Sequence, residues 1–351
     1  KRVHEMGEAY SSPWLKPGDS CDGSVEAVGR PRRPMAGATR RLYAVSRDLY
    51  APVLAAFATE WLEGLVARPG TVAMCLGRDG IAAFVAARVL LRTRPERFHG
   101  VHPRQVRLAY ISRGLANAAA DDQGQATLLD RYLQAQGVRG TGALTVVDVG
   151  IHGSIQDALQ RIYPSRPLHG HYLLLRRRAA DRNGAAKRGF LAEVDVPPPA
   201  PLTVAPSWPP PPAWDLGGTL RRGDPLFLRR RSVHVLEDLW NGVGESAEAW
   251  RTSASATRVE TVRRRAQTIV ALPPGPLITS AEQVRLKRVA LRGIADGVAR
   301  TEPPTVERDY IGGLGEWLRG LEYPDPLDRY ILTALVRSGW QTGAADELVA
   351  E

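Results

Sequence analysis

The residues best suited to chemistry follow an apolar stretch near the middle of the chain. Residues 144–148 read Leu-Thr-Val-Val-Asp, and the loop after them contains Gly150, Ile151, His152, Gly153 and Ser154. Backbone N–H groups at the start of a helix attract phosphate, and glycines let the phosphate come close. Asp148 could accept hydrogen bonds from a sugar, and Ser154 could donate one. The pattern predicts a phosphate or sugar site; the alternative is a strand–turn–helix in which both residues are caps.

Two further loops follow apolar stretches of the same kind. One is Gly77-Arg78-Asp79-Gly80, and the other is Ser112-Arg113-Gly114. A guanidinium suits phosphate oxygens and a carboxylate suits Mg²⁺ or its waters, so the first loop could hold a polyanion with its metal. Each loop alone is equally typical of a turn. Three such loops at one sheet edge would converge on one cleft.

The elements that must position these loops alternate between strands and helices. We expect strands at 71–76, 106–111, 144–148, 169–175 and 190–196, and helices at 42–65, 81–91, 126–136 and 154–162. This alternation favours an α/β fold, a parallel sheet with helices on both faces. Such sheets bind ligands at the carboxyl ends of their strands, where all three loops fall.

Composition divides the chain into four parts. Residues 1–40 are rich in Gly, Pro, Ser and Arg, which predicts an irregular tail before the α/β core at 41–196. Residues 197–213 hold two proline runs and predict a stiff linker. Residues 214–351 are expected to form a mainly helical second domain or cap, with helices at 233–240, 279–299, 310–321 and 327–336.

The overall composition excludes several classes of protein. The chain has 351 residues, of which 44% are hydrophobic and 24% charged, as in a folded globular protein. We see no run of about 18 apolar residues and no signal peptide, and therefore expect a cytoplasmic protein without a membrane span. The net charge of +10 comes from scattered arginines, so we do not expect a nucleic-acid surface.

Two side chains outside these patterns are candidates for acid–base chemistry. His152 lies in the glycine-containing loop and is either a general acid or base or an ordinary loop histidine. Glu237 lies in the predicted helix at 233–240. It either reaches the cleft or is a solvated helix charge.

Together, the three loops resemble those of type I phosphoribosyltransferases. The closer resemblance is to the phosphoribosyltransferase-like module of bacterial ribofuranosyltransferases, which act in surface-polysaccharide assembly. That module has Arg-Asp-Gly, then Ser-Arg after the next strand, then Asp-x-Gly-x-x-Gly-Ser-x-Gln. This chain shows Arg78-Asp79-Gly80, Ser112-Arg113 and Asp148-Val-Gly150-Ile-His-Gly153-Ser154-Ile-Gln156, and the resemblance covers about residues 45–245.

The resemblance implies a glycosyltransferase that moves a 5-phosphoribosyl group from phosphoribosyl pyrophosphate (PRPP) to a hydroxyl of a sugar, glycan or natural product. Mg²⁺ would be the cofactor, with Asp79 facing it. The pyrophosphate would contact Gly77, Arg78, Gly80, Ser112 and Arg113, and the 5-phosphate would contact residues 150–154. Asp148 would hold the ribose hydroxyls. Asp79 is the first choice for catalytic base and Glu237 the second.

The chain departs from the family pattern in two ways. Val149 stands where the usual phosphoribosyltransferase loop has a second acid, which weakens ribose recognition. We find no Asp-x-Asp start of the phosphatase domain that often accompanies the module, so either a separate phosphatase removes the 5-phosphate or the product keeps it. Two alternatives stay open: transfer to a nucleobase or another nitrogen, and a non-catalytic PRPP-sensing module.

Overall fold

The computed structural model describes residues 33–138, 142–178, 181–196, 219–241, 247–252, 259–263, 269–270, 277–278, 280–302 and 309–336. The predicted proline-rich linker at 197–213 and residues 1–32 of the predicted tail lie outside these ranges.

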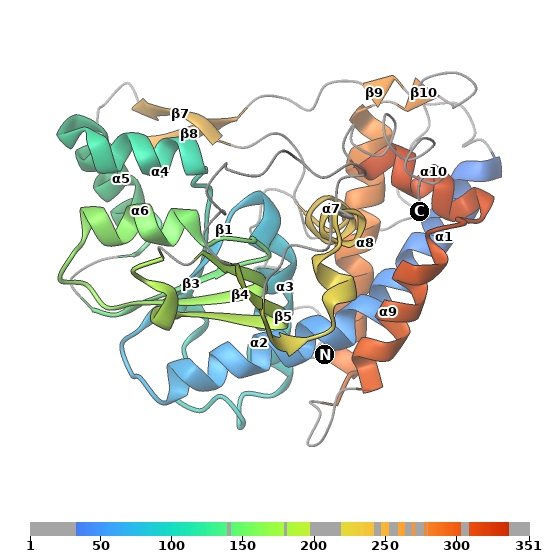
Figure 1. Cartoon of the computed structure of the whole chain (residues 1–351), viewed down its shortest axis with the longest axis horizontal. Coiled ribbons are helices and arrows are strands. Elements are labelled where there is room, and N and C mark those ends of the chain that lie inside the picture. The colour runs from blue at the N-terminus through green and yellow to red at the C-terminus, as the bar shows by residue number, and fades with distance from the viewer. Residues whose placement is uncertain are drawn as a thin grey trace, which may run out of the picture.

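A six-stranded, mainly parallel sheet forms the centre of the fold (Figure 1). Its strands are β1 (Val72–Leu76), β2 (Val106–Ala109), β3 (Leu144–Asp148), β4 (Leu168–Arg178), β5 (Lys187–Val196) and β6 (Thr219–Gly223), in the order β2-β1-β3-β4-β5-β6. The first five strands are parallel, and β6 pairs antiparallel with β5. The α/β class predicted from the sequence is confirmed. The edge strand β6 was not predicted, because its sequence is short and largely polar.

Helices cover both faces of the sheet. Helices α2 (Ala51–Val66) and α3 (Ile81–Thr93) pack on one face, and α4 (Arg113–Asp121), α5 (Gln123–Ala135) and α6 (Ser154–Ile162) pack on the other. Successive residues of β1 enter different cores: Cys75 belongs to the first and Met74 to the second. This alternation is the period of two that a strand covered on both faces must have.

A long helical segment precedes the first strand. It consists of α1 (Arg33–Val45), a π-helical turn (Ser46–Tyr50) and α2. The tail predicted over residues 1–40 was therefore wrong for residues 33–40, which are helical because Ala38 and Leu42 are buried in the core. The segment Ala36–Val66 is long and apolar enough to cross a membrane, and 67% of its most apolar window is buried inside the fold, as in a core helix.

The C-terminal helices extend the core of the α/β part. They are α7 (Arg230–Asp238), α8 (Ser280–Arg300), α9 (Asp309–Gly320) and α10 (Pro326–Leu335). Helix α8 packs along α1, α2 and α3, and its residues Leu286 and Ile294 belong to the same core cluster as those helices (Figure 1). Residues of α9 and α10, among them Leu314 and Ile331, belong to this cluster as well.

Short elements complete the described structure. Two small antiparallel sheets, β7–β8 (Ala247–Thr252 and Val259–Arg263) and β9–β10 (Ile269–Val270 and Leu277–Ile278), were not predicted. Single 3-10 turns occupy Arg78–Gly80, Pro103–Gln105, Gly184–Ala186 and Pro225–Leu228. The first of these turns follows β1 directly and belongs to the site described next.

Candidate functional site

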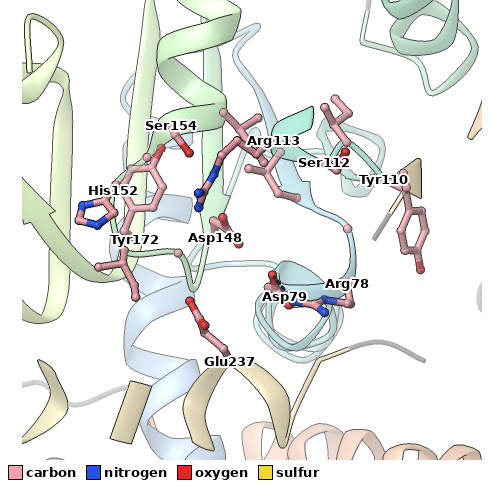
Figure 2. Close-up of a pocket in the computed structure, with 18 of the residues that line it drawn as sticks. Arg78, Asp79, Tyr110, Ser112, Arg113, Asp148, His152, Ser154, Tyr172 and Glu237 are labelled. Atoms are coloured by element: carbon pink, nitrogen blue, oxygen red, sulfur yellow. Dashed lines mark hydrogen bonds and ion pairs between the residues drawn. The ribbon is translucent and has the colours of Figure 1, made fainter. Parts of the chain in front are cut away.

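A cleft of about 510 Å³ opens at the carboxyl ends of β1, β2 and β3 (Figure 2). These strands are neighbours in the sheet. The next two strands along the chain after β1, namely β2 and β3, lie on opposite sides of it. Such a switch point is where open α/β sheets bind ligands. Every predicted site residue lines the cleft except Gly80, and Tyr110, Tyr172 and Ala247 line it as well.

Gly80 has a structural role that the sequence analysis did not foresee. It is buried, and a Cβ atom at this position would lie 3.1 Å from the carbonyl oxygen of Val147. The glycine therefore allows the turn after β1 to pack closely on β3. It supports the loop and does not line the cleft, which corrects its assignment to ligand binding.

Two helices begin at the cleft, and a third follows a turn whose residues Arg78 and Asp79 line it. Helix α3 follows the turn Arg78–Gly80, and α6 begins at Ser154. Helix α4 begins at Arg113, and the Oγ of its N-cap Ser112 accepts a hydrogen bond from the backbone N–H of Leu115 at 3.2 Å. A helix N-terminus carries a partial charge of roughly +0.5. Two of them at one cleft, together with Arg78 and Arg113, favour a ligand with several negative charges.

Two glycines shape the loop between β3 and α6. A Cβ at Gly150 would lie 2.6 Å from Asp148 Oδ2, and a Cβ at Gly153 would lie 2.8 Å from the Tyr172 hydroxyl. Gly153 also has a φ of +61°, in the left-handed region that favours glycine. These constraints account for both glycines of the motif. They let the chain turn from strand to helix beside Asp148, whose Oδ1 accepts from Val149 N at 2.9 Å.

Three carboxylates from different elements share the cleft, namely Asp79, Asp148 and Glu237 (Figure 2). Burial, followed by the charges of Asp79 and Glu237, raises the pKa of Asp148 well above its usual range. Burial and the neighbouring Asp79 and Asp238 raise the pKa of Glu237 to about 7. This acidic group therefore holds negative charge that a proton or a cation would relieve.

The acidic group does not form a complete metal site by itself. Within the described ranges, no three His, Cys, Asp or Glu side chains are placed to hold a metal ion together. Carboxylate oxygens are nevertheless the ligand type that Mg²⁺ prefers, and Mg²⁺ usually keeps several waters and phosphate ligands. The donor set thus fits a magnesium ion that arrives with a phosphorylated ligand, and Asp79 remains a candidate to face it.

Arg78 and Asp79 form a closed pair in the first loop. Arg78 Nε and Nη2 donate to the two carboxylate oxygens of Asp79 at 2.8 and 3.2 Å. Arg78 has a φ of +44°, an unfavourable conformation for a non-glycine residue that is typically found at functional sites. Its Nη1 is buried and has no hydrogen-bond partner among the described residues. The pair therefore leaves one donor nitrogen unused.

His152 is oriented by the neighbouring strand. Its Nδ1 lies 3.0 Å from the backbone oxygen of Arg176, so Nδ1 carries the proton in the neutral ring. Burial lowers the pKa of His152, and the nearby arginines Arg178, Arg176 and Arg113 lower it further. A neutral ring held in this way is better suited to forming a polar wall of the cleft than to binding a charged phosphate.

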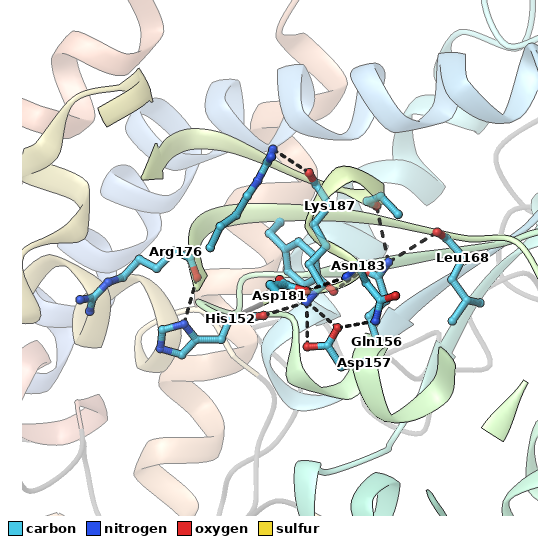
Figure 3. A network of polar contacts seen from close by, with 11 residues as sticks. His152, Gln156, Asp157, Leu168, Arg176, Asp181, Asn183 and Lys187 are labelled. Carbon is cyan, nitrogen blue, oxygen red and sulfur yellow. Dashed lines mark hydrogen bonds and ion pairs between the residues drawn. The ribbon is translucent and has the colours of Figure 1, made fainter. Parts of the chain in front are cut away.

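A buried lysine supports the same loop from behind (Figure 3). Lys187 Nζ donates to Asp157 Oδ2 and Asp181 Oδ2, both at 2.8 Å, and to the backbone oxygen of His152 at 3.2 Å. Asn183 Nδ2 donates to the other oxygen of Asp157 at 2.9 Å. No role was predicted for Lys187. It is the first residue of β5 and is followed by Arg188, so its position in the sequence does not indicate that its side chain is buried.

Two residues behind the acidic group were also missed. Asn241 follows α7, and Lys287 lies on α8; both are buried. Lys287 falls within the apolar stripe of its helix, next to Leu286 and one turn before Leu291. A charge at such a position indicates a buried partner.

A scan against protein-family models finds no match for this chain, and a search of curated proteins finds no similar sequence. The geometry of the cleft therefore carries the functional argument.

Proposed function

We propose that this protein is a PRPP-dependent transferase with a phosphoribosyltransferase-like sheet, which moves a 5-phosphoribosyl group to an acceptor hydroxyl. The observation that carries the proposal is the convergence of two helix N-termini, those of α4 and α6, and two arginines, Arg78 and Arg113, on one cleft. PRPP has a phosphate and a pyrophosphate on opposite sides of a ribose. Asp148 lies between Ser154 and Asp79 in the view of Figure 2, where the ribose hydroxyls would be.

Charge supports a role for magnesium in donor binding. The cleft holds three carboxylates, Asp79, Asp148 and Glu237, against the guanidinium groups of Arg78 and Arg113. A polyanion alone would be repelled by this acidic group. Asp79, with help from Asp148 or Glu237, would hold the ion beside the pyrophosphate. When bound, Mg²⁺ neutralises charge on the departing pyrophosphate.

The side chains of the cleft divide the reaction between them. Arg78, Arg113 and the start of α4 stabilise the charge that develops on pyrophosphate as its bond to C1 breaks. The start of α6 holds the 5-phosphate, and Asp148 orients the ribose. The acceptor oxygen forms the new bond to C1 and gives up its proton, and pyrophosphate leaves.

The structure favours Glu237 over Asp79 as the base that takes this proton. Arg78 donates to both carboxylate oxygens of Asp79, so this carboxylate is already engaged in an ion pair. Glu237 has no such ion pair among the described residues, and its pKa of about 7 suits proton transfer at neutral pH. Asp79, the first choice from the sequence, is thus better suited to facing the metal.

One observation favours a hydroxyl acceptor over a nucleobase. A nucleobase would stack on an aromatic ring of the cleft, and Tyr172 is one of the two tyrosines that line it. The side chain of Tyr172 is fully buried, and its hydroxyl donates to Gln156 Oε1 at 2.8 Å. Tyr110 is the other tyrosine at the cleft, and a nucleobase would have to stack there.

The proposal is tested by measuring pyrophosphate release from PRPP with Mg²⁺ and a panel of sugars, polyols and nucleobases. We expect release with hydroxyl acceptors and at least about 100-fold slower release in Asp148→Asn. Asp121→Asn is the control, because Asp121 is exposed and pairs with Arg161 outside the cleft. Release with nucleobases alone would establish the nitrogen-acceptor alternative. Binding of PRPP without turnover would favour the sensing module.

A further inference from the structure

Helix α8 is linked to the acidic group through the buried side chain of Lys287. Lys287 of α8 donates from Nζ to the backbone oxygens of Asp238 and Leu239, the latter at 3.3 Å, and to Asn241 Oδ1 at 2.6 Å. An ammonium group has three protons, so these acceptors use all of them. Because two acceptors lie at the end of α7, Lys287 caps the helix that carries Glu237.

Lys287 also determines how the amide of Asn241 is oriented. Since Oδ1 of Asn241 accepts from the ammonium, Nδ2 must face the opposite way. There it donates to Asp79 Oδ1 at 3.5 Å and to Asp238 Oδ1 at 3.4 Å. A flipped amide would place its NH₂ group against the ammonium, which would be repulsive.

Asp79 needs this support because its own loop is strained. Its ion-pair partner Arg78 has a φ of +44°, and such conformations persist only where the surroundings enforce them. Asn241 supplies a hydrogen bond to Asp79 from outside that loop. The loop is therefore linked to α8 through one amide and one ammonium.

We propose that Lys287 is a positioning residue of the site. It holds Asp79 through Asn241, and it holds Glu237 through the end of α7. The identity of the ligand, PRPP with Mg²⁺, rests on the proposed function. The linkage between α8 and residues 77–80 does not depend on it. Helix α8 thereby has a role in positioning the acidic group of the cleft.

The linkage is tested in the unliganded full chain by hydrogen exchange of the backbone amides at residues 77–80. The variants are Lys287→Met, Asn241→Leu and the double variant. The matched control is Gln283→Leu, which removes a buried hydrogen bond one turn earlier on α8, from Nε2 to the oxygen of Ala334 at 3.0 Å. We expect exchange at 77–80 to rise about 10-fold or more in both single variants, and to stay unchanged in the control.

A second readout measures the dissociation constant of PRPP with Mg²⁺ by calorimetry. Each single variant should weaken binding about 10-fold, and the double variant no further, because both residues act through one linkage. Unchanged exchange at 77–80 in folded Lys287→Met would overturn the inference. If that variant does not fold, unchanged exchange in Asn241→Leu would do so. Loosened amides in a protein whose wild type does not bind PRPP would support the positioning role and reject the proposed function.

Discussion

The ammonium of Lys187 lies 2.8 Å from Asp157 Oδ2, and this pair joins strand β5 to the first turn of helix α6. The same ammonium donates to Asp181 and to the backbone oxygen of His152. Lys187 does not line the cleft. A phosphate bound at the start of α6 would therefore depend on a side chain that supports the loop from behind.

Replacing Lys187 should cost stability and donor affinity together. Lys187→Met leaves the buried Asp181 without its cation, and losing one partner of a buried pair costs about 3–5 kcal/mol. The double variant with Asp181→Asn should recover part of this loss, because the uncompensated charge is gone. Urea unfolding measures the free energies. A loss below about 1 kcal/mol in the single variant would contradict the supporting role.

Replacing Asp148 should separate activity from stability. Its pKa is raised by burial and by Asp79 and Glu237, so its negative charge opposes folding at neutral pH. Asp148→Asn should therefore unfold at the same temperature as wild type or a higher one at pH 8, while turnover falls by about two orders of magnitude or more. Thermal unfolding and pyrophosphate release measure the two effects. Wild-type turnover in this variant would remove the sugar-binding assignment.

The segment from β3 to α6 could be predicted to the residue because its signals are local. A continuous apolar run ends in Asp148, two glycines follow, and Ser154 opens a helix. Helix α4 was not predicted, since Arg113–Asp121 contains Gly114 and a single large apolar residue, Leu115. Its Ser112 was expected at the cleft all the same, because the end of a parallel strand fixes where the next residues lie.

Contacts between distant segments could not be predicted. The sequence placed Glu237 on a helix but could not decide whether it faces the cleft, because that depends on how α7 packs against the sheet. Lys287 lies 208 positions after Asp79 in the numbering, and only tertiary packing of α8 brings their network together. The apolar neighbours of Lys287 indicate its burial but not its partners.

The proposed base predicts a particular pH dependence of the reaction. The profile of kcat/KM reports ionisations of the free enzyme. Since Glu237 must be deprotonated to accept a proton, kcat/KM should rise with pH and level off above about 7. Glu237→Gln should be slower and should lack this ionisation. A variant that retains the rise near pH 7 would assign the base to another residue.

Glu237 and Lys287 should both make the stability of the fold depend on pH, with opposite signs. Glu237 has a pKa of about 7 in the fold against an ordinary 4.5, so the stability it contributes is lost as pH rises between these values. This loss is at most on the order of 3 kcal/mol. Burial lowers the pKa of Lys287 from 10.5 to about 7. The contribution of Lys287 to the free energy of unfolding therefore becomes more favourable as pH rises from 7 to 10.5.

Unfolding free energies across pH 4.5–10.5 check both signs. The difference between Glu237→Gln and wild type should grow in favour of the variant between pH 4.5 and 7. The difference between Lys287→Met and wild type should change only above pH 7. Parallel curves for Glu237→Gln and wild type would show that Glu237 has an ordinary pKa.

Titration calorimetry measures whether the cleft binds PRPP with magnesium, as we propose. Wild type would be titrated with PRPP in the presence and absence of Mg²⁺, with ribose 5-phosphate and pyrophosphate as partial ligands. We expect Mg²⁺-dependent binding of PRPP that is tighter than that of either part and is lost in Asp148→Asn. No binding of PRPP under either condition would contradict the claim.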